Sequence, residues 1–283
     1  MTRLIYIANN RLPTEKAHGL QIVQMCEAFA GQGYDVTLVT ARRINTPNMR
    51  KIDDLWAHYG VRKTFEFVRI PCLDLIDRVP TAIQRPFFML QTLTYMLCLL
   101  VWLPFQRGRV FYTRDLFIGV MLASLPTFPE VAYEVHQVHH SRLGRMLQSY
   151  LVRNSHVIPI TGHLAAKMRD RGALRWRVEH DGFRPERFAD LPSRAEARSH
   201  LDIAAGAFVV GYVGRLHTMG MSKGLDTLVD AVTQAAQRGA DVHVLVVGGP
   251  GVQGVDGVAD AALARAAQGL GNDRVLRQVE FFA

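Results

Sequence analysis

Acidic residues and cysteines are both scarce in this sequence, and each shortage excludes a class of protein. The chain has 25 Asp and Glu against 33 Lys and Arg, which gives a net charge of +8. A basic protein suits a phosphorylated substrate, an anionic membrane surface or a nucleic acid. The three cysteines, Cys26, Cys72 and Cys98, form no CxxC pair. We therefore expect reduced thiols and a cytoplasmic protein, not a secreted domain held by disulfides.

Other signatures are missing as well. The cations are scattered along the chain, without zinc-finger spacing or an aromatic RNA-binding motif, so we expect no nucleic-acid partner. No segment repeats at a solenoid period. Residues 1–8 form a short apolar run that lacks the longer apolar segment and the cleavage site of a secretory signal.

The sequence does contain a regular alternation of strand and helix patterns. Residues 3–8 and 36–40 are apolar and β-rich, and the helix between them has an apolar stripe at three- and four-residue spacing. This pattern predicts a βαβ unit and a parallel sheet with helices on both faces. Further strands are predicted at residues 65–70, 110–113, 131–136, 156–160 and 178–180, and further helices after an Asp115 cap, at 141–153 and at 162–171.

A second series of the same kind begins at residue 208. Strands are predicted at 208–213, 242–247 and 275–279, with a helix at 223–238. The turn-rich run at 181–188, with a capping box starting at Ser193 behind it, predicts a domain boundary. The predicted fold class is therefore α/β, with two Rossmann-like domains at residues 1–180 and 181–283. The second domain has only three predicted strands, and we expect it to be incomplete.

The most apolar stretch covers residues 86–105, with Arg85 before it and Arg107 and Arg109 after it. A helix of this length is about 30 Å long, enough to cross a bilayer core. Polar side chains such as Gln91 interrupt its first half. Three interpretations stay open: a buried or self-associating helix, a helix lying on an anionic membrane surface, and a membrane span.

A strand-loop-helix segment in the second series has the form of a phosphate site. An apolar strand ends in Gly214, Arg215 follows at once, and Lys223 opens the next helix. Backbone N–H groups at a helix start, together with guanidinium and ammonium groups, bind phosphate oxygens. The alternative is a surface turn with two solvated cations.

Residues at the carboxyl ends of the first-domain strands are candidates for ligand contact. Gly19 ends the long loop after the first strand, where it either admits a substrate or makes the turn. His136 ends another strand and is followed by His139 and His140, but this spacing matches no strong metal motif, so we predict no metal site. The alternative for His136 is a histidine that satisfies a nearby carbonyl. The Asp181-Gly182 turn at the boundary is expected to line a cleft.

One glycine pattern supports a different function. Residues 249–254 fit G-x-G-x-x-G, with Glu280 as a possible ribose partner, which would make the chain an NAD-dependent oxidoreductase. The glycines lie in the middle of the second series and not in its first strand-to-helix turn, so a plain loop is the other interpretation.

Taken together, these segments resemble the GT-B glycosyltransferases of the large retaining group called family 4. The matching runs are AHGLQ at residues 17–21, GYDVTLV at 33–39, DGFRPERF at 181–188, VGRL at 213–216 and KGLDTL at 223–228. The third run has Asp181 where the family usually has Asn. The family's paired glutamates lie downstream of any residue in this sequence, so we expect a truncated member.

The resemblance implies a function and roles for the candidate residues. Arg215, Lys223 and Gly19 would contact the diphosphate of a nucleotide-sugar donor, and His136 would lie at the donor sugar near its reacting carbon. The first domain would face a lipid-linked or saccharide acceptor, and the sugar would be transferred with retention and without a cofactor or metal. We expect a cytoplasmic protein of envelope polysaccharide or glycolipid synthesis, peripheral on the inner membrane face. The alternative is a non-catalytic nucleotide-binding protein.

Overall fold

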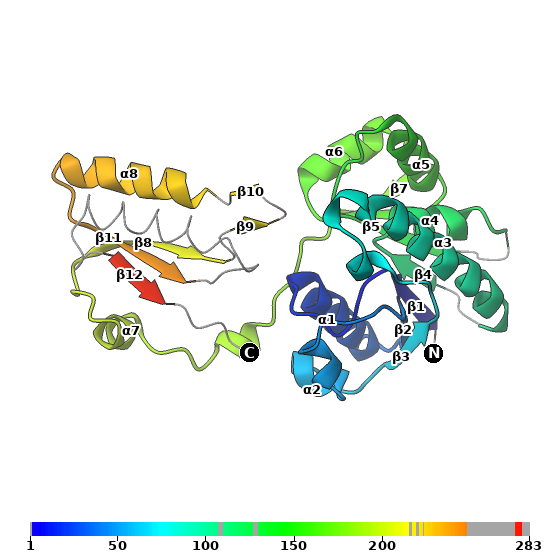
Figure 1. Cartoon of the computed structure of the whole chain (residues 1–283), viewed down its shortest axis with the longest axis horizontal. Helices are drawn as coiled ribbons and strands as arrows, with labels where there is room; N and C mark the ends of the chain where they lie inside the picture. Colours follow the sequence, from blue (N-terminus) through cyan, green and yellow to red (C-terminus); the bar gives the residue numbers. More distant parts are fainter. Residues whose placement is uncertain are drawn as a thin grey trace. The chain divides into compact units, whose positions relative to one another are not determined.

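The computed structural model describes two units of the chain. The residues described are 2–106, 110–126, 130–214, 217–218, 221–222, 224–247 and 275–278. The chain divides after Phe183 into units of residues 1–183 and 184–283, each with its own core (Figure 1).

Unit 1 is built on a parallel seven-stranded sheet in the order β3-β2-β1-β4-β5-β6-β7. Its strands are β1 (Arg3–Ala8), β2 (Asp35–Ala41), β3 (Glu66–Ile70), β4 (Val110–Thr113), β5 (Glu130–Val135), β6 (His156–Pro159) and β7 (Arg175–Trp176). The order runs outward in one direction from β1 and in the other from β4. The sheet therefore has a topological switch point between β1 and β4, where α/β proteins bind ligands.

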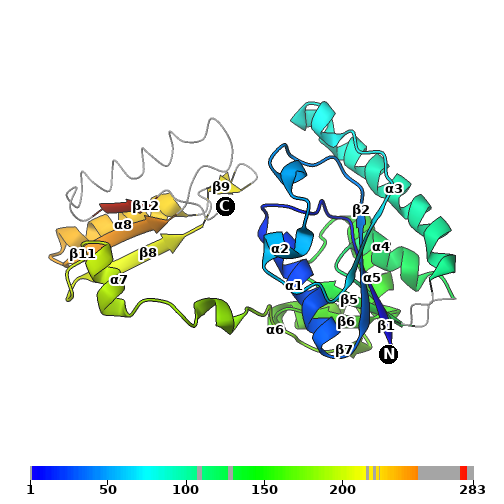
Figure 2. The same cartoon turned by 90° about the horizontal axis from the view of Figure 1, so that it is seen from below.

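Helices cover both faces of this sheet (Figures 1 and 2). They are α1 (Ala17–Gly31), α2 (Leu55–Tyr59), α3 (Gln84–Trp102), α4 (Leu116–Ala123), α5 (Arg142–Arg153) and α6 (Gly162–Asp170), with single 3₁₀ turns at Met49–Lys51, Ile76–Arg78, Thr81–Ile83 and Leu103–Phe105. Side-chain oxygens cap several helix starts, and Asp115 accepts from the Ile118 N–H at the start of α4, as the sequence predicts.

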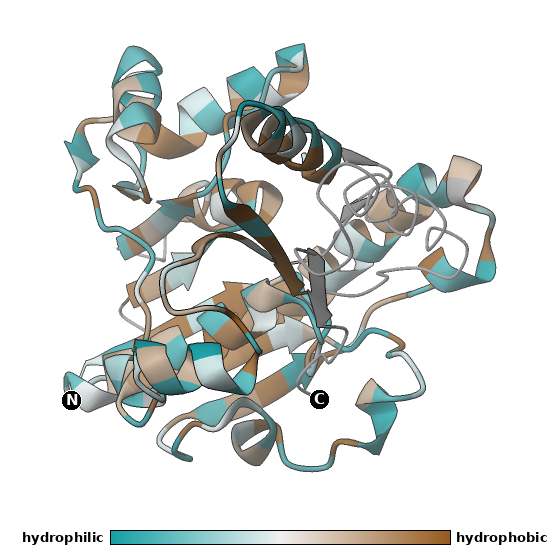
Figure 3. Ribbon diagram, turned by 90° about the vertical axis from the view of Figure 1, so that its left-hand side faces the viewer, coloured by the Kyte–Doolittle hydropathy of each residue, from teal (hydrophilic) through white to brown (hydrophobic). Residues whose placement is uncertain are grey.

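Alternate residues of β1 point into two different cores. Leu4 and Tyr6 pack with α1 and α2, whereas Ile5 and Ile7 pack with α3 and α4. A strand with both faces covered is apolar throughout, which is why these strands are evident in the sequence. The strands are mainly brown in Figure 3, and the helices alternate brown and teal.

Unit 2 has a parallel three-stranded sheet in the order β12-β11-β8. Its elements are a 3₁₀ turn (Pro185–Phe188), α7 (Arg194–His200), β8 (Phe208–Val213), the antiparallel pair β9 (His217–Thr218) and β10 (Met221–Ser222), α8 (Leu225–Gln237), β11 (Val242–Val247) and β12 (Val275–Gln278). The capping box at Ser193 and Glu196 is present as predicted.

The strand predicted at residues 178–180 is wrong. The last strand of the unit 1 sheet is β7, which begins at Arg175 and pairs with only two residues of β6. Beyond it the N–H groups of Arg177 and Glu179 still bond to carbonyls of β6, but without a regular ladder. Pro159 has no N–H to return such a bond, so the pairing ends there.

Candidate functional site

The site of unit 1 lies at the switch point of the sheet, where three neighbouring strands end. The loop after β1 leads into α1, Arg114 follows β4, and His136 follows β5. Because the carboxyl ends of parallel strands share one edge, these segments converge there.

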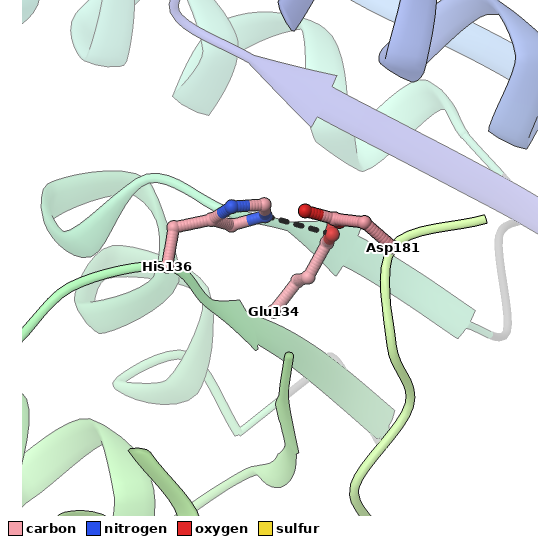
Figure 4. Close-up of side chains that lie close together, drawn as sticks. All are labelled: Glu134, His136 and Asp181. Atoms are coloured by element: carbon pink, nitrogen blue, oxygen red, sulfur yellow. Dashed lines mark hydrogen bonds and ion pairs between the residues drawn. The ribbon is translucent and has the colours of Figure 1, made fainter. Parts of the chain in front are cut away.

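His136 is held by a buried carboxylate. Its Nε2 lies 2.8 Å from Oε1 of Glu134, which is only 3% exposed (Figure 4). Glu134 and His136 are two residues apart, so both side chains leave β5 on the same face. The Tyr6 hydroxyl donates to the other carboxylate oxygen of Glu134 at 3.4 Å. The carboxylate therefore fixes the position of the imidazole.

Burial alone would raise the pKa of Glu134. The hydrogen bond with His136 and the charge of Arg114 outweigh it, so the pKa of Glu134 lies below its ordinary value. Burial raises the pKa of the Tyr6 hydroxyl well above its usual range. Glu134 is thus a fixed negative charge inside the protein, with Tyr6 as a donor to it.

Arg114 joins His136 to helix α1. Its Nη2 lies 2.6 Å from Nε2 and 3.0 Å from Nδ1 of His136, and it donates to Oε1 of Gln21 at 2.9 Å. A guanidinium only donates and an ionised carboxylate only accepts. One ring nitrogen of His136 therefore accepts from Arg114, and the N–H of the other donates to Glu134. The second nitrogen of the fork, Nη1, is buried and has no hydrogen-bond partner within the described part of the chain.

Gln21 continues the network to the end of unit 1. Its amide donates to a carboxylate oxygen of Asp181, so Asp181 belongs to the same cluster as His136. The structure therefore brings two of the predicted site residues together, through Arg114 and Gln21. Gly182 is exposed beside them.

Three of these residues could also hold a metal ion. Ligand atoms of Glu134, His136 and Asp181 all lie within 4.8 Å of one another (Figure 4). However, the Arg114 guanidinium contacts the same imidazole, and its permanent charge repels a cation.

The start of α1 adds positive charge to this edge. The N-cap residue is Lys16, and α1 has neither a side-chain cap nor an acidic residue in its first turn. Burial, Lys16 and Arg114, in that order of size, lower the pKa of His18 to about 4. Uncapped N–H groups and the helix dipole attract anions, and here they meet the cations Lys16 and Arg114.

A polar cavity of about 90 Å³ lies beside this helix start. Lys16 and His18 line it together with Arg11 and Arg43. Both arginines are already paired, Arg11 with Asp77 at 2.7 Å and Arg43 with Asp74 at 3.3 Å. Among the described lining residues, Lys16 is the cation without an ion pair, and the carboxylate of Glu15 lines the same cavity.

Gly19 lies in the first turn of α1, and the structure gives it a packing role. A Cβ at this position would collide with the Thr14 side chain and would lie 2.5 Å from the Tyr59 hydroxyl. That hydroxyl is fixed, because it accepts from the Thr14 N–H at 2.7 Å and donates to the Thr14 carbonyl at 2.8 Å. Gly19 thus lets the β1–α1 loop lie close to the helix.

The remaining candidates lie outside the described residues. These are Arg215, Lys223, the glycines of residues 249–254 and Glu280. The structure does describe Gly214, which directly follows β8 and has a φ of +149°, and Gly224, the N-cap of α8, which has a φ of +82°.

Sequence reasoning missed Arg114, Gln21 and Lys16. Arg114 carries the same signal that identified His136, a polar residue directly after a buried strand. Gln21 has no such signal, because its role depends on which face of α1 meets β4.

No model of a known protein family matches the chain, and no curated protein matches its sequence. Solved structures match over its whole length. HepE of Anabaena, solved with UDP and glucose, is 16% identical with a TM-score of 0.64, covering 100% of this chain and 70% of HepE. Sucrose-phosphate synthase from Thermosynechococcus elongatus is 19% identical with a TM-score of 0.68, covering 99% and 71%. The trehalose 6-phosphate synthase from Burkholderia multivorans is 13% identical with a TM-score of 0.64, covering 100% and 74%.

These neighbours are GT-B glycosyltransferases. The chain therefore has the GT-B fold of Rossmann-like domains, and the predicted fold class is confirmed. At these identities the likeness shows the fold and leaves the function to be argued from the site.

Proposed function

We propose that the chain is a glycosyltransferase that transfers a sugar from a nucleotide-diphosphate sugar to an acceptor. One observation carries this proposal: Lys16, His18 and Arg114 lie close together at the uncapped, positive end of α1, and a buried Arg114 nitrogen has no hydrogen-bond partner among the described residues. Lys16 and Arg114 are cations and His18, with a pKa of about 4, is a neutral imidazole beside them, so this place attracts an anion. A diphosphate supplies that anion, and HepE, which shares the fold, has been solved with UDP-glucose.

The chemistry follows from the charge that develops as the sugar leaves. Breaking the bond between sugar and phosphate places negative charge on the departing diphosphate, and donors already fixed in position stabilise it. Arg114 is such a donor, held by Gln21 on one side and by His136 on the other. His136, fixed by Glu134, would lie at the reacting carbon, and the sugar would keep its configuration through an oxocarbenium-like transition state. Arg215 and Lys223 remain proposed diphosphate ligands of unit 2, on the sequence resemblance.

The proposal includes the cellular location of the enzyme and its acceptor. We assign the enzyme to family 4 and to the cytoplasm, acting as a peripheral protein on the inner membrane face. Its acceptor would be a lipid-linked or saccharide intermediate of envelope polysaccharide or glycolipid synthesis. The net charge of +8 supports an anionic surface as the setting.

Nucleotide binding to the full chain tests the proposal. UDP or GDP should raise the melting temperature of the protein. Arg114→Ala should lower the affinity for that nucleotide by roughly 10-fold or more, because a charge-assisted contact is lost. Arg153→Ala is the matched control: Arg153 is exposed in the last turn of α5, away from the carboxyl edge of the sheet. Release of the nucleoside diphosphate from a labelled donor then measures turnover.

Three results would count against the proposal. A response to NAD alone would favour the oxidoreductase interpretation of residues 249–254. Equal nucleotide affinity in the wild type and in Arg114→Ala would mean that the nucleotide does not bind at this site of unit 1. Tight nucleotide binding without turnover of any sugar donor would leave a non-catalytic nucleotide-binding protein.

A further inference from the structure

Helix α3 is oriented with its polar side chains inward. Gln91, Thr92 and Tyr95 are buried, at 0%, 3% and 0% exposure. Asn9 accepts from the Gln91 amide and donates to the Thr92 hydroxyl, both at 2.9 Å, and the Tyr95 hydroxyl bonds to carbonyls of β1 and β2. A helix that packs on a sheet in water normally has the opposite arrangement.

The outer face of α3 is apolar along its length. Leu93 is 55% exposed, Leu97 52% and Val101 71%. The outer face consists of Met89, Leu90, Leu93, Leu97, Leu100 and Val101, which share one side of the helix. From Met89 to Val101 this surface extends over about 18 Å. Soluble proteins rarely expose so long a continuous apolar strip.

An apolar hollow continues the outer face. It has a volume of about 510 Å³ and lies between α3 and the end of β3, where Ile70, Leu97, Val101 and Phe105 line it. Phe105, in the 3₁₀ turn after α3, is 79% exposed. The hollow is large enough to admit part of an acyl chain, and Leu97 and Val101 belong both to its lining and to the outer face.

The charge around α3 is positive. Arg85 is the only ionisable Asp, Glu, Lys or Arg among residues 84–106, and Arg107 and Arg109 follow in the sequence. Asp74 and Asp77 precede the helix, but Arg43 and Arg11 already pair with them. An apolar strip between arginines complements an anionic lipid surface.

We propose that the outer face of α3 docks unit 1 onto an anionic membrane, lying in the interface with its apolar side chains among the lipids. By length and composition alone, Gln84–Phe105 is also able to span a bilayer. However, Tyr95, Leu99 and Leu103 belong to the core between α3 and the sheet. A span would remove them from this core and would leave Asn9 without either partner, so α3 lies on the membrane and does not cross it.

A second copy of the chain fits the outer face less well than lipid does. Two-fold pairing of antiparallel α3 helices would bring Arg85 of one copy towards the Arg107 and Arg109 end of the other. Like charges would then meet at both ends of the interface. Anionic headgroups instead pair with both ends at once.

This inference rests on the proposed function only for its purpose, which is to bring the site to a lipid-linked acceptor. The test is sedimentation of the full chain with vesicles of phosphatidylcholine, with and without phosphatidylglycerol. The double variant Leu93→Asp/Leu97→Asp should lower the partition coefficient roughly 10-fold or more, because two charges would enter the apolar boundary. Leu143→Asp is the matched control, since Leu143 is equally exposed, at 56%, but lies on α5.

The salt concentration separates the electrostatic contribution to vesicle binding from the apolar one. Raising it from about 0.1 M to about 1 M should remove the preference for phosphatidylglycerol and leave a weaker, apolar binding. The inference is overturned if the wild type stays in the supernatant with both kinds of vesicle, or if Leu143→Asp loses as much vesicle binding as the double variant. It is also overturned if equilibrium sedimentation shows that the outer face pairs two copies of the chain.

Thermal response to UDP distinguishes this inference from the proposed function. The double variant should keep the UDP response of the wild type, which shows that its fold and site are intact. Vesicle binding without any nucleotide response would count against the proposed function alone, whereas a nucleotide response without vesicle binding would count against the docking surface alone.

Discussion

His18 is the residue whose ionisation depends most directly on whether the site is filled. Burial and the charges of Lys16 and Arg114 lower its pKa to about 4. A bound diphosphate would supply negative charge and raise this pKa towards or above its ordinary value of 6.5. Binding would then take up a proton between the two values, so His18 should strengthen nucleotide binding as the pH falls.

We predict that this contribution vanishes in His18→Gln. The dissociation constant for UDP, measured by calorimetry between about pH 5 and about pH 8, should show the affinity of the wild type rising relative to the variant as the pH falls below about 6.5. The comparison cancels titration of the phosphate itself, which both proteins share. Parallel curves would mean that no phosphate lies near His18.

At the residue scale, the sequence could predict positions but not partners. His136 was identified because polar residues after buried strands lie at the ligand edge, and Arg114 satisfies the same rule. That Arg114 donates to both His136 and Gln21 depends on the strand order, which places β4 between β1 and β5. Strand order is set by tertiary packing and leaves no local trace in the sequence.

Helix α1 and the loop before it behave as one packed element, and Gly19 is where they meet. We predict that Gly19→Ala lowers the free energy of unfolding by about 1–3 kcal/mol, since the added methyl group meets Thr14 and the fixed Tyr59 hydroxyl. Gly31→Ala is the control in the same helix, because a Cβ there has nothing within 4 Å. Urea unfolding of both variants gives the measurement, and equal stability would contradict the packing role.

At the element scale, the sequence predicted the buried strands of unit 1 and most helices from their apolar periodicity. It left α3 open, because almost every position from 86 to 105 is apolar and no stripe shows which side faces inward. The direction is set by Asn9, which is distant in the sequence and bonds to Gln91 and Thr92. The short strand at 178–180 was misplaced for a different reason: Pro159 in the neighbouring strand ends the pairing.

At the scale of the whole molecule, the described residues form two units joined by an exposed segment. Residues 188–196 are all exposed, and α7 contains no buried residue. We predict that a broad-specificity protease cuts the full chain first in this segment and leaves a resistant fragment close to residues 1–183. Mass spectrometry of the early products checks this, and first cuts within β1 to β6 would contradict it.

At this scale the sequence predicted a boundary between residues 180 and 181, within the same turn-rich run where the structure divides after Phe183. Composition identifies such a run because Gly, Pro and charged residues cannot build a core. It does not show that Asp181 is still tied to Gln21 and therefore stays with unit 1.

The inward polar side of α3 has a practical consequence for anyone who handles the protein. The hydrogen bonds of Asn9 and Tyr95 fix the rotation of the helix about its own axis, so α3 cannot turn to bury its leucines. In water, these leucines have to be covered by lipid, by detergent or by neighbouring molecules. The yield of the purified protein, its aggregation and its elution volume in size-exclusion chromatography should therefore depend on how this one surface is covered.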